Sequence, residues 1–300
     1  MKNSKKLICL LLAAIMIFAF AACGSDPAPA ASPEAPEVSE APEAPEAPAE
    51  DSDAAYIMNN GKLVIGITMY PPMNFYGDDG ALTGFDTEVA QAVCDSLGIE
   101  AEFVEINWDS KEIELNAKNI DCLWNGMCIT EERKENMSIS SPYMYNDQAL
   151  VMKADREEEI MASVDGLTLT AEAGSTGEGK YDGSIADDGT EDISAAEYLA
   201  NVNYIPSDSM AKALMEVKSG TADFAIVDST LGFYSVGEGT DFEDLVCNND
   251  LNFGSQQFGI AFRKGSDFTQ VVNGKLAELL ADGTLDEIAS HYGLEDALVR

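Results

Sequence analysis

The sequence predicts an α/β protein of two lobes joined by a double-crossover hinge. From residue 61 onward, short apolar strand-like runs alternate with segments of helical periodicity, which is the pattern of sheets covered by helices. Two further strand-like runs, 148–152 and 257–264, lie where the chain would cross from one unit into a second and return. Together, the alternation and the two crossings favour two lobes.

The first lobe is predicted from residues 54–147 and 258–300. Its best-defined element is a helix at 85–97, where apolar residues recur on one face and Gly98 follows as a terminator. The other elements expected there are strands at 62–68, 101–106 and 120–124, and helices at 111–118, 267–280 and 285–291. The second lobe, 148–257, is expected to hold a helix at 155–164, a strand at 167–169, a turn at Gly174, a helix at 207–219 and a strand at 224–227.

An internal repeat supports two equivalent lobes. Residues 114–126 and 216–228 share one scheme: the end of a helix, a turn, an Asp, an apolar strand, and then a Gly or polar residue. Because ligands of open α/β sheets bind beyond the carboxyl ends of strands, Gly126 and Asp228 are expected to face one cleft from opposite lobes. The alternative is two ordinary βα units with no shared site.

The first 53 residues are predicted to lie outside both lobes. Residues 1–22 have a basic start and an apolar run, the pattern of a secretion signal that is too short for a comfortable membrane span. Ala21-Ala22-Cys23 ends this run as a lipoprotein cleavage site does, so a diacylglycerol group is expected on Cys23. Residues 23–53 repeat Ala-Pro-Glu and predict a tether of roughly 90 Å at about 3.1 Å per residue. We therefore expect an exported protein, lipid-anchored at the extracellular face of the cell membrane.

Composition excludes several classes of protein. With 17 Lys and Arg against 54 Asp and Glu, the net charge of −37 repels nucleic acid and anionic membrane. The cysteines match no zinc or redox spacing and His291 is the only histidine, so metal sites, cofactors and Ser-His or Cys-His nucleophiles have little support. Cys94, Cys122, Cys128 and Cys247 are expected to be small buried apolar side chains, and the sequence leaves their disulfide state open.

The segment 124–133, Trp-Asn-Gly-Met-Cys-Ile-Thr-Glu-Glu-Arg, has the features of an anion receptor. It leaves a predicted strand through a Gly turn and enters a helix, for which Thr130 is the expected N-cap. Arg133 follows in the first turn, and a guanidinium beside backbone amides suits a carboxylate because its planar fork makes two charge-assisted hydrogen bonds. The alternative is a surface Arg133 paired with Glu131 or Glu132.

This segment resembles the Gly-Met-Thr-Ile-Thr-x-x-Arg signature of the bacterial extracellular solute-binding proteins of family 3, the polar amino-acid receptors of ABC transporters. Five other stretches resemble the same family, and together they cover most of residues 60–293 in the family's order. They are Gly-Lys-Leu-Val-Ile-Gly-Ile-Thr-Met-Tyr-Pro-Pro at 61–72, Leu-Thr-Gly-Phe-Asp-Thr-Glu at 82–88, Gly-Ser-Thr-Gly-Glu at 174–178, Ala-Asp-Phe-Ala-Ile-Val-Asp at 222–228 and Phe-Gly-Ile-Ala-Phe-Arg-Lys at 258–264.

The resemblance implies a periplasmic-binding-protein type II fold and a function. Such a protein captures an α-amino acid in the cleft between its lobes, closes by a hinge, and delivers the ligand to the permease subunits of an ABC transporter. It implies a monomer, and nothing in the sequence requires catalysis.

The resemblance also assigns roles to residues. Arg133 would take the ligand carboxylate with the amides of Cys128 and Thr176, while Asp228 and the Gly126 carbonyl would take the ammonium. Asp228 has an alternative role as the cap of a helix that begins near Thr230. The complete expected ligand-binding set is Tyr70, Trp108, Asn125, Gly126, Cys128, Arg133, Glu172, Ser175, Thr176 and Asp228.

Three of these residues bear on the ligand's side chain. Tyr70 and Trp108 match the positions where family members sandwich the ligand between aromatic rings. The turn before Tyr70 lacks the Asp that receptors for basic amino acids carry, which argues against lysine, arginine or histidine. Glu172 matches a position that points toward the far end of the ligand. A carboxylate there favours a side chain with a hydrogen-bond donor over an acidic one.

Two rival functions remain from the sequence. The same fold occurs in cyclohexadienyl dehydratases, which need a general acid at the cleft, and Glu172 or Asp228 are the candidates. A sensor module of a signalling system would differ only in its partner. Motifs that resemble a P-loop at 174–180 and a calcium loop at 78–80 are better explained as an anion-holding turn and a hairpin turn, because each lacks required ligands. His291 is expected to face solvent.

Overall fold

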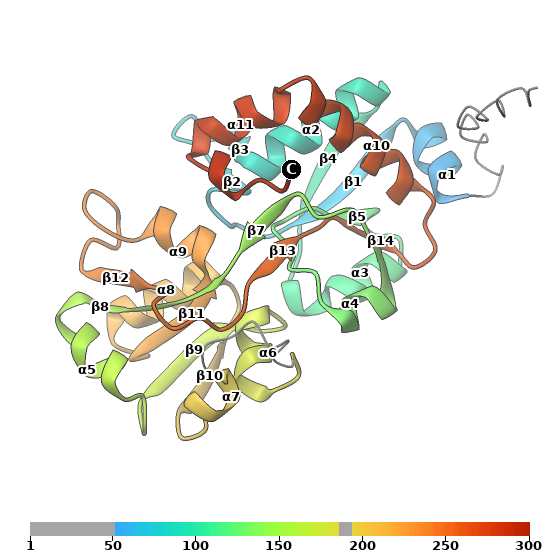
Figure 1. Ribbon diagram of the computed structural model, residues 1–300. Coiled ribbons are helices and arrows are strands. Elements are labelled where there is room, and N and C mark those ends of the chain that lie inside the picture. The colour runs from blue at the N-terminus through green and yellow to red at the C-terminus, as the bar shows by residue number, and fades with distance from the viewer. Residues whose placement is uncertain (1–51, 186–193) are drawn as a thin grey trace, which may run out of the picture. The chain divides into compact units, whose positions relative to one another are not determined.

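The computed structural model describes residues 52–185 and 194–300, which form two α/β lobes joined by two crossings (Figure 1). Each lobe contains one five-stranded sheet. In spatial order, the strands of lobe 1 are β4 (Glu100–Glu105), β1 (Lys62–Ile67), β5 (Cys122–Leu123), β14 (Ala261–Arg263) and β6 (Met137–Ile139). Those of lobe 2 are β10 (Asn203–Ser207), β9 (Thr168–Glu172), β11 (Phe224–Asp228), β8 (Gln148–Lys153) and β12 (Leu245–Asn248).

The two crossings pair with each other. Strand β7 (Met144–Asn146) of the outgoing segment runs antiparallel to β13 (Gln256–Phe258) of the returning one. In each sheet, the strand that follows a crossing is antiparallel to its neighbour: β8 against β11 in lobe 2, and β14 against β5 in lobe 1. The predicted double crossover and α/β class are confirmed. The lobe boundaries predicted at 147 and 257 lie beside β7 and within β13, and they stay a prediction.

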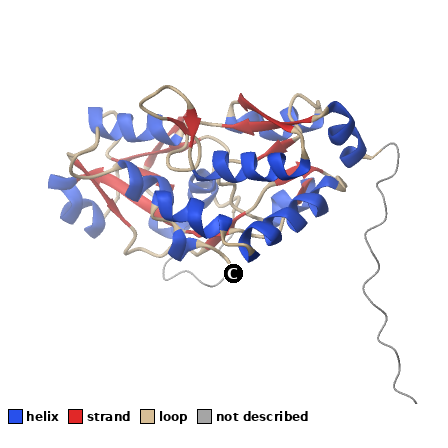
Figure 2. Ribbon diagram, turned by 90° about the horizontal axis from the view of Figure 1, so that it is seen from above, coloured by secondary structure: helices blue, strands red, loops and turns tan. Residues whose placement is uncertain are grey.

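Helices flank the sheets of both lobes (Figure 2). Those of lobe 1 are α1 (Asp53–Asn60), α2 (Phe85–Leu97), α3 (Lys111–Asn116), α4 (Glu131–Asn136), α10 (Phe268–Ala281) and α11 (Thr284–Tyr292). Those of lobe 2 are α5 (Glu157–Ala162), α6 (Thr176–Asp182), α7 (Ala195–Tyr198), α8 (Met210–Ser219) and α9 (Ser229–Ser235). A hairpin of β2 (Phe75–Tyr76) and β3 (Leu82–Thr83) and 3-10 turns at Trp108–Ser110, Ala154–Arg156 and Glu295–Ala297 complete the described elements.

The internal repeat of the sequence has a structural counterpart in two aspartates. The Asp121 amide donates to Val64 O (2.7 Å), and its carboxylate accepts from Val64 N (3.0 Å). Asp223 makes the same pair of hydrogen bonds with Thr168, at 2.8 and 2.7 Å. Each Asp thereby brackets one residue of the neighbouring parallel strand, which fixes the register of β5 against β1 and of β11 against β9.

Several local predictions are confirmed. Helix α2 spans 85–97, and Gly98 ends it in the left-handed region (φ 70°), which glycine adopts without steric cost. The 78–80 motif forms the turn of the β2–β3 hairpin, with Gly80 at φ 77°. The His291 side chain is 58% exposed.

Strands β6, β7, β10 and β12 were not predicted, and β10 overlaps a predicted helix. The predicted helix at 207–219 begins only at Met210, after the Ser209 hydroxyl accepts a hydrogen bond from Lys212 N (3.1 Å) as its N-cap. The preceding residues form β10 instead. Pro206 in that strand has no N–H to donate, and β10 is accordingly an edge strand of its sheet. The proline weakens the sequence signal for a strand, which is why periodicity did not find it.

Smaller differences concern element ends. Helix α1, capped by the Ser52 hydroxyl, begins at the last residue of the predicted tether. The helix predicted at 155–164 is a 3-10 turn followed by the shorter α5. The predicted signal peptide at 1–22, the lipidation residue Cys23 and the tether as far as residue 51 lie outside the described residues. Within the described ranges, no helix has both the length and the apolar character needed to cross a membrane.

The four cysteines of the lobes are free thiols in this structure. Cys94, Cys122 and Cys128 are buried, as expected, whereas Cys247 is only partly buried. Burial raises the pKa of Cys94 to about 12, so this thiol stays protonated at neutral pH.

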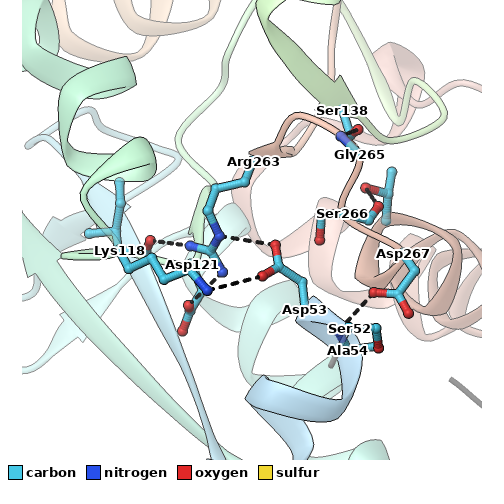
Figure 3. A network of polar contacts seen from close by, with 12 residues as sticks. Ser52, Asp53, Ala54, Lys118, Asp121, Ser138, Arg263, Gly265, Ser266 and Asp267 are labelled. Carbon is cyan, nitrogen blue, oxygen red and sulfur yellow. Dashed lines mark hydrogen bonds and ion pairs between the residues drawn. The ribbon is translucent and has the colours of Figure 1, made fainter. Parts of the chain in front are cut away.

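A buried ionic network ties the start of α1 to the sheet of lobe 1 (Figure 3). The Arg263 guanidinium donates to Asp53 (3.0 Å), to Asp121 (3.1 Å) and to the carbonyl of Ile120 (2.8 Å). The Arg263 and Asp121 side chains are only 9% and 5% exposed. The network therefore fixes the point at which the chain enters the lobe, next to the return strand β14.

We predict that Arg263→Ala lowers the free energy of unfolding by about 3 to 5 kcal/mol, because it leaves the buried Asp121 carboxylate without its cation. Urea denaturation monitored by circular dichroism measures this loss. Arg156→Ala is the matched control, since Arg156 pairs with the equivalent Asp223 but both side chains are about 30% exposed. We expect the control to cost about 1 kcal/mol or less. Equal losses in the two variants would contradict the prediction.

Candidate functional site

A small cavity lies between the lobes, where the carboxyl ends of β1, β5, β9 and β11 converge. All ten residues predicted for the ligand site line it, and Thr68 and Met210 line it as well. The structure thus brings the predicted residues together, while their contact with a ligand stays a prediction. The lining residues are Thr68, Tyr70, Trp108, Asn125, Gly126, Cys128 and Arg133 from lobe 1, and Glu172, Ser175, Thr176, Met210 and Asp228 from lobe 2.

Arg133 is held in place by the start of α4. The Thr130 hydroxyl accepts a hydrogen bond from Arg133 N (3.2 Å), which confirms Thr130 as the N-cap. The Arg133 side chain then donates to the carbonyls of Cys128 (2.8 Å) and Gly174 (3.1 Å). Only 6% of the residue is exposed. The alternative of a surface arginine paired with a neighbouring glutamate is therefore wrong.

Asp228 supplies the opposite charge at the end of β11. Its carboxylate accepts hydrogen bonds from Tyr70 Oη (2.9 Å), Asn146 Nδ2 (2.9 Å) and Gln148 Nε2 (2.5 Å). Although Asp228 precedes α9, its side chain makes no capping hydrogen bond, so the alternative role as a helix cap is wrong. Burial raises the pKa of Asp228 against the opposing effect of these donors.

Gly126 is required by the tight packing around it. Its φ is 56°, and a Cβ there would lie 2.4 Å from Cε1 of Tyr70. The Gly126 amide donates to Asp86 Oδ2 (2.6 Å), which also accepts from Tyr143 Oη (2.9 Å). Asp86 on α2 therefore positions the Gly126 turn from behind the cavity. The sequence contained Asp86 within a family motif, but nothing in its local pattern indicated this role.

Asn125 lines the cavity, but its side chain makes hydrogen bonds within lobe 1. Its amide oxygen accepts from Thr68 N (3.1 Å) and Thr68 Oγ1 (2.8 Å), and its amide nitrogen donates to Asn74 Oδ1 (2.7 Å). These hydrogen bonds hold the end of β1 and the loop that carries Tyr70. Tyr70 and Trp108 are buried at 4% and 5% exposure.

The Gly174 turn connects β9 to α6. The Ser175 hydroxyl accepts from Glu178 N (3.2 Å), and the Glu178 carboxylate accepts from Gly174 N (2.6 Å). The Gly174 amide is therefore already hydrogen-bonded to a carboxylate of the chain, whereas a P-loop would use such an amide to bind phosphate. Thr176 is the first residue of α6, so its amide is one of those that a helix leaves without an intrahelical acceptor.

Cys128 replaces the hydroxyl residue of the family signature with a thiol. Its Sγ lies 3.2 Å from Gln256 Oε1 and 3.7 Å from Asp228 Oδ1. Burial raises the pKa of this thiol well above its ordinary value, so it remains a neutral, weak donor.

A second pair of charged residues lies beside Arg133 and Asp228. Glu172 is 4% exposed, its Oε1 has no hydrogen-bond partner, and burial raises the pKa of its carboxyl to about 8. Lys111 is 7% exposed, and its ammonium donates to the carbonyls of Trp108 (3.2 Å) and Gly174 (3.0 Å). Burial lowers the pKa of Lys111 to about 8. Sequence reasoning gave Lys111 only as the start of a helix, a place where lysine is commonly exposed.

The cavity is too small for an amino acid with the lobes in this arrangement. Its volume is about 20 Å³, about that of one water molecule, whereas ligand pockets commonly have about 300 Å³ or more. Hydrogen bonds from Tyr70, Lys111 and Arg133 of lobe 1 to Asp228 and Gly174 of lobe 2 join the lobes around it. Entry of a ligand therefore requires the lobes to separate at the hinge.

Two α/β lobes joined by a double crossover, with buried charges of both signs between them, define the class of two-lobed solute-binding proteins. A model of the bacterial extracellular solute-binding proteins, family 3, matches residues 63–295. The chain belongs to this family.

Individual relatives agree with this assignment. The L-cystine-binding protein TcyJ of Escherichia coli K12 is 30% identical over 239 residues, which cover 79% of this chain and 84% of the relative. A substrate-binding protein of an ABC uptake transporter from Streptococcus pneumoniae, solved with bound histidine, is 28% identical with a TM-score of 0.71, covering 84% and 100% of the two chains. The ancestral amino-acid-binding protein AncCDT-1, a precursor of cyclohexadienyl dehydratase, is 29% identical with a TM-score of 0.69, covering 80% and 99%.

We predict that Asp86 makes the protein less stable as the pH rises from about 4 to about 7. Burial raises the pKa of Asp86 from 3.8 to about 7, so in this window the folded state holds a proton that the unfolded state has lost. Its stabilising contribution is fully present below the lower pKa and is lost as the pH passes the higher one.

Urea denaturation of wild type and Asp86→Asn across this pH range measures the effect. The difference between the two free energies of unfolding should change over the window and level off above it. Asp95→Asn, an exposed position on the same helix, should leave the wild-type slope unchanged. Parallel curves for wild type and Asp86→Asn would show that Asp86 does not titrate in this way.

Proposed function

We propose that this protein is a receptor that captures an α-amino acid between its lobes and delivers it to the permease of an ABC transporter. The observation that carries the proposal is the burial of one cation, Arg133, and one anion, Asp228, in a single cavity. An α-amino acid bears a carboxylate and an ammonium on one carbon, so it complements both charges at once.

Arg133 is the proposed site for the ligand carboxylate. Its guanidinium already donates to two backbone carbonyls, and five N–H groups leave donors for a further acceptor. The amides of Cys128 and Thr176 are proposed to add two more donors. A carboxylate bound here would neutralise a guanidinium that is otherwise buried among dipoles.

Asp228 and the Gly126 carbonyl are the proposed sites for the ligand ammonium. Asp228 is supported by three neutral donors, which orient its carboxylate without neutralising its charge. Tyr70 and Trp108 would form the walls along the ligand's side chain. The relatives that bind cystine and histidine support an amino-acid ligand with a polar side chain.

The route of delivery follows from the hinge. The cavity has to open before a ligand can enter. Hydrogen bonds from lobe 1 to Asp228 and to the Gly174 carbonyl of lobe 2 then favour closure around the ligand. A closed monomer would then present a complementary surface to permease subunits. A sensor module would use the same closure with a different partner.

We predict that Arg133→Ala abolishes amino-acid binding and leaves the protein folded. Removing one partner of a buried charge pair costs about 2 to 5 kcal/mol, which takes a micromolar ligand beyond ready detection. The measurement is a calorimetric screen of residues 24–300, which keep Ser52 and Asp53, against the common amino acids and cystine. Lys134→Ala is the control, because this neighbouring side chain is 52% exposed and contacts Glu131. Wild-type affinity in a folded Arg133→Ala protein would show that Arg133 does not bind the ligand carboxylate.

The same protein preparation tests the enzyme alternative. Glu172 is a buried carboxyl with a pKa of about 8, so it is protonated at neutral pH and has the character of a general acid. One structural neighbour is a dehydratase precursor. Release of phenylpyruvate from prephenate would support catalysis, whereas amino-acid binding without this reaction supports the receptor.

For localisation, we propose export and a lipid anchor on Cys23, with residues 23–53 as the tether. The support is the sequence pattern at 1–23 and the extracellular family. We predict that Cys23→Ser abolishes incorporation of labelled palmitate, because the thiol is the attachment atom. Cys94→Ser, a buried position in lobe 1, is the control and should still incorporate the label. Normal labelling of the Cys23→Ser protein would refute the anchor.

A further inference from the structure

Two buried amides contact Asp228 from outside the set of residues that line the cavity. Asp228 Oδ1 accepts hydrogen bonds from Gln148 Nε2 (2.5 Å) and Asn146 Nδ2 (2.9 Å), whereas Asp228 Oδ2 accepts one from Tyr70 Oη (2.9 Å). Gln148 and Asn146 are only 1% and 3% exposed, and neither lines the cavity. One carboxylate oxygen is therefore bound by the outgoing crossing, and the other is bound by lobe 1.

The Gln148 contact belongs to the sheet of lobe 2. Gln148, the first residue of β8, is directly opposite Asp228, the last residue of β11, in the antiparallel pairing of these strands. Because both residues lie in one sheet, we expect this hydrogen bond to be kept when the lobes separate. Tyr70 lies in lobe 1, so its hydrogen bond to Asp228 is lost on opening. In the open form, the Asp228 carboxylate thus depends on the two amides.

Of the two amides, Gln148 is the more direct one to test. Asn146 also contacts the start of α9, because its amide oxygen accepts a hydrogen bond from Thr230 Oγ1 (3.0 Å). A substitution of Asn146 would therefore disturb a helix as well as Asp228. The amide nitrogen of Gln148 donates only to Asp228 and to Gln256 Oε1 (3.1 Å) on the returning crossing, as far as the described residues show.

The orientation of the Gln148 amide has a cost. Its nitrogen faces two acceptors, while its Oε1 is buried with no hydrogen-bond partner among the described residues. Rotating the amide would place this oxygen against the Asp228 carboxylate, which has no proton to donate when it is ionised. A buried oxygen without a partner is unfavourable. The hydrogen bond to the Asp228 carboxylate therefore outweighs the loss at Oε1.

We propose that Gln148 is a positioning residue that keeps the Asp228 carboxylate charged and in place before a ligand arrives. This inference rests on the proposed role of Asp228 as the site for the ligand ammonium. Burial raises the pKa of Asp228, and the hydrogen bond from Gln148 is the strongest effect that opposes this rise. Without Gln148, Asp228 keeps its proton to a higher pH, and a neutral carboxyl attracts an ammonium less.

Other titratable groups also face Asp228. Arg133, on α4, favours the charged form of Asp228. Burial raises the pKa of Glu172, at the end of β9, to about 8, so Glu172 is mainly neutral at neutral pH. Burial also raises the pKa values of Tyr70 and Cys128 above their ordinary range, so both side chains stay protonated. All four groups are the same in wild type and in a variant of the amide, so a difference between the two proteins reports on the amide.

The first test needs no ligand. Gln148→Met removes the donor and keeps the length of the side chain, so the pKa of Asp228 should be higher in this variant than in wild type. Carbon-13 NMR of labelled aspartate carboxyls measures this pKa, and Asp228→Asn identifies the signal. Gln148→Asn, whose amide is one methylene shorter, is a second variant with the same expected direction, in case methionine is not accepted at the buried site.

The second test is binding. Calorimetry with the common amino acids and cystine should show affinities that are lower in Gln148→Met by about tenfold or more, because a hydrogen bond to a charged group is lost. The factor should be similar for every ligand that wild type binds, since all share the ammonium. As the pH is lowered, binding by the variant should begin to weaken at a higher pH than binding by wild type.

Thr170→Val is the matched control. Thr170 is a fully buried residue of the same sheet, and its hydroxyl donates to Glu216 (2.8 Å) and not to Asp228. The control removes one buried hydrogen bond and should leave both the pKa of Asp228 and the affinities unchanged.

Three results would overturn the inference. These are an unchanged Asp228 pKa in folded Gln148→Met and Gln148→Asn, an equal effect in Thr170→Val, and a loss of affinity with no shift of its pH dependence, which would give Gln148 a structural role alone. If wild type bound no amino acid but the pKa of Asp228 still rose in the Gln148 variants, the positioning role would be supported and only the proposed receptor would fail.

Discussion

Two of the hydrogen bonds that join the lobes converge on one backbone carbonyl, that of Gly174. It accepts hydrogen bonds from both Arg133 and Lys111, so a single oxygen of lobe 2 holds two cations of lobe 1. Two buried cations repel each other, and a shared acceptor dipole between them offsets part of that repulsion. Glu178 fixes the turn that carries this carbonyl, because its carboxylate accepts a hydrogen bond from the Gly174 amide.

Strand geometry explains why these groups meet. The bracketing aspartates, Asp121 and Asp223, set β5 and β11 in equivalent registers against their parallel neighbours. A few residues later, each strand leads to a residue that lines the cavity, Gly126 in lobe 1 and Asp228 in lobe 2. The repeat therefore places the Gly126 turn of lobe 1 and the Asp228 carboxylate of lobe 2 at the same cavity. In both sheets, the strand on the other side of β5 or β11 is antiparallel to it. These strands, β14 and β8, are the ones that follow the crossings between the lobes.

Much of this was predictable, and the exceptions have physical reasons. Helix α2, the Thr130 cap and the double crossover follow from periodicity and capping chemistry, which are local. The ten predicted site residues came from the family resemblance, Trp108 and Glu172 by their positions and the others from its motifs. Lys111 was missed because its burial depends on a carbonyl from the other lobe, and Asp86 because it acts through the Gly126 amide. Contacts between residues far apart in the chain leave no periodic trace in either segment.

The same distant contacts bury charged and titratable groups between the lobes. Closing the lobes removes Arg133, Asp228, Lys111 and Glu172 from water, and desolvation of charged groups is costly unless each finds a partner. The protein supplies carbonyls to the two cations and neutral donors to Asp228, but it leaves one oxygen of Glu172 unmatched. A ligand can shift the hinge equilibrium only by the difference between its interactions with the closed and open forms. A ligand that pairs with this unmatched oxygen would therefore favour the closed form over the open one.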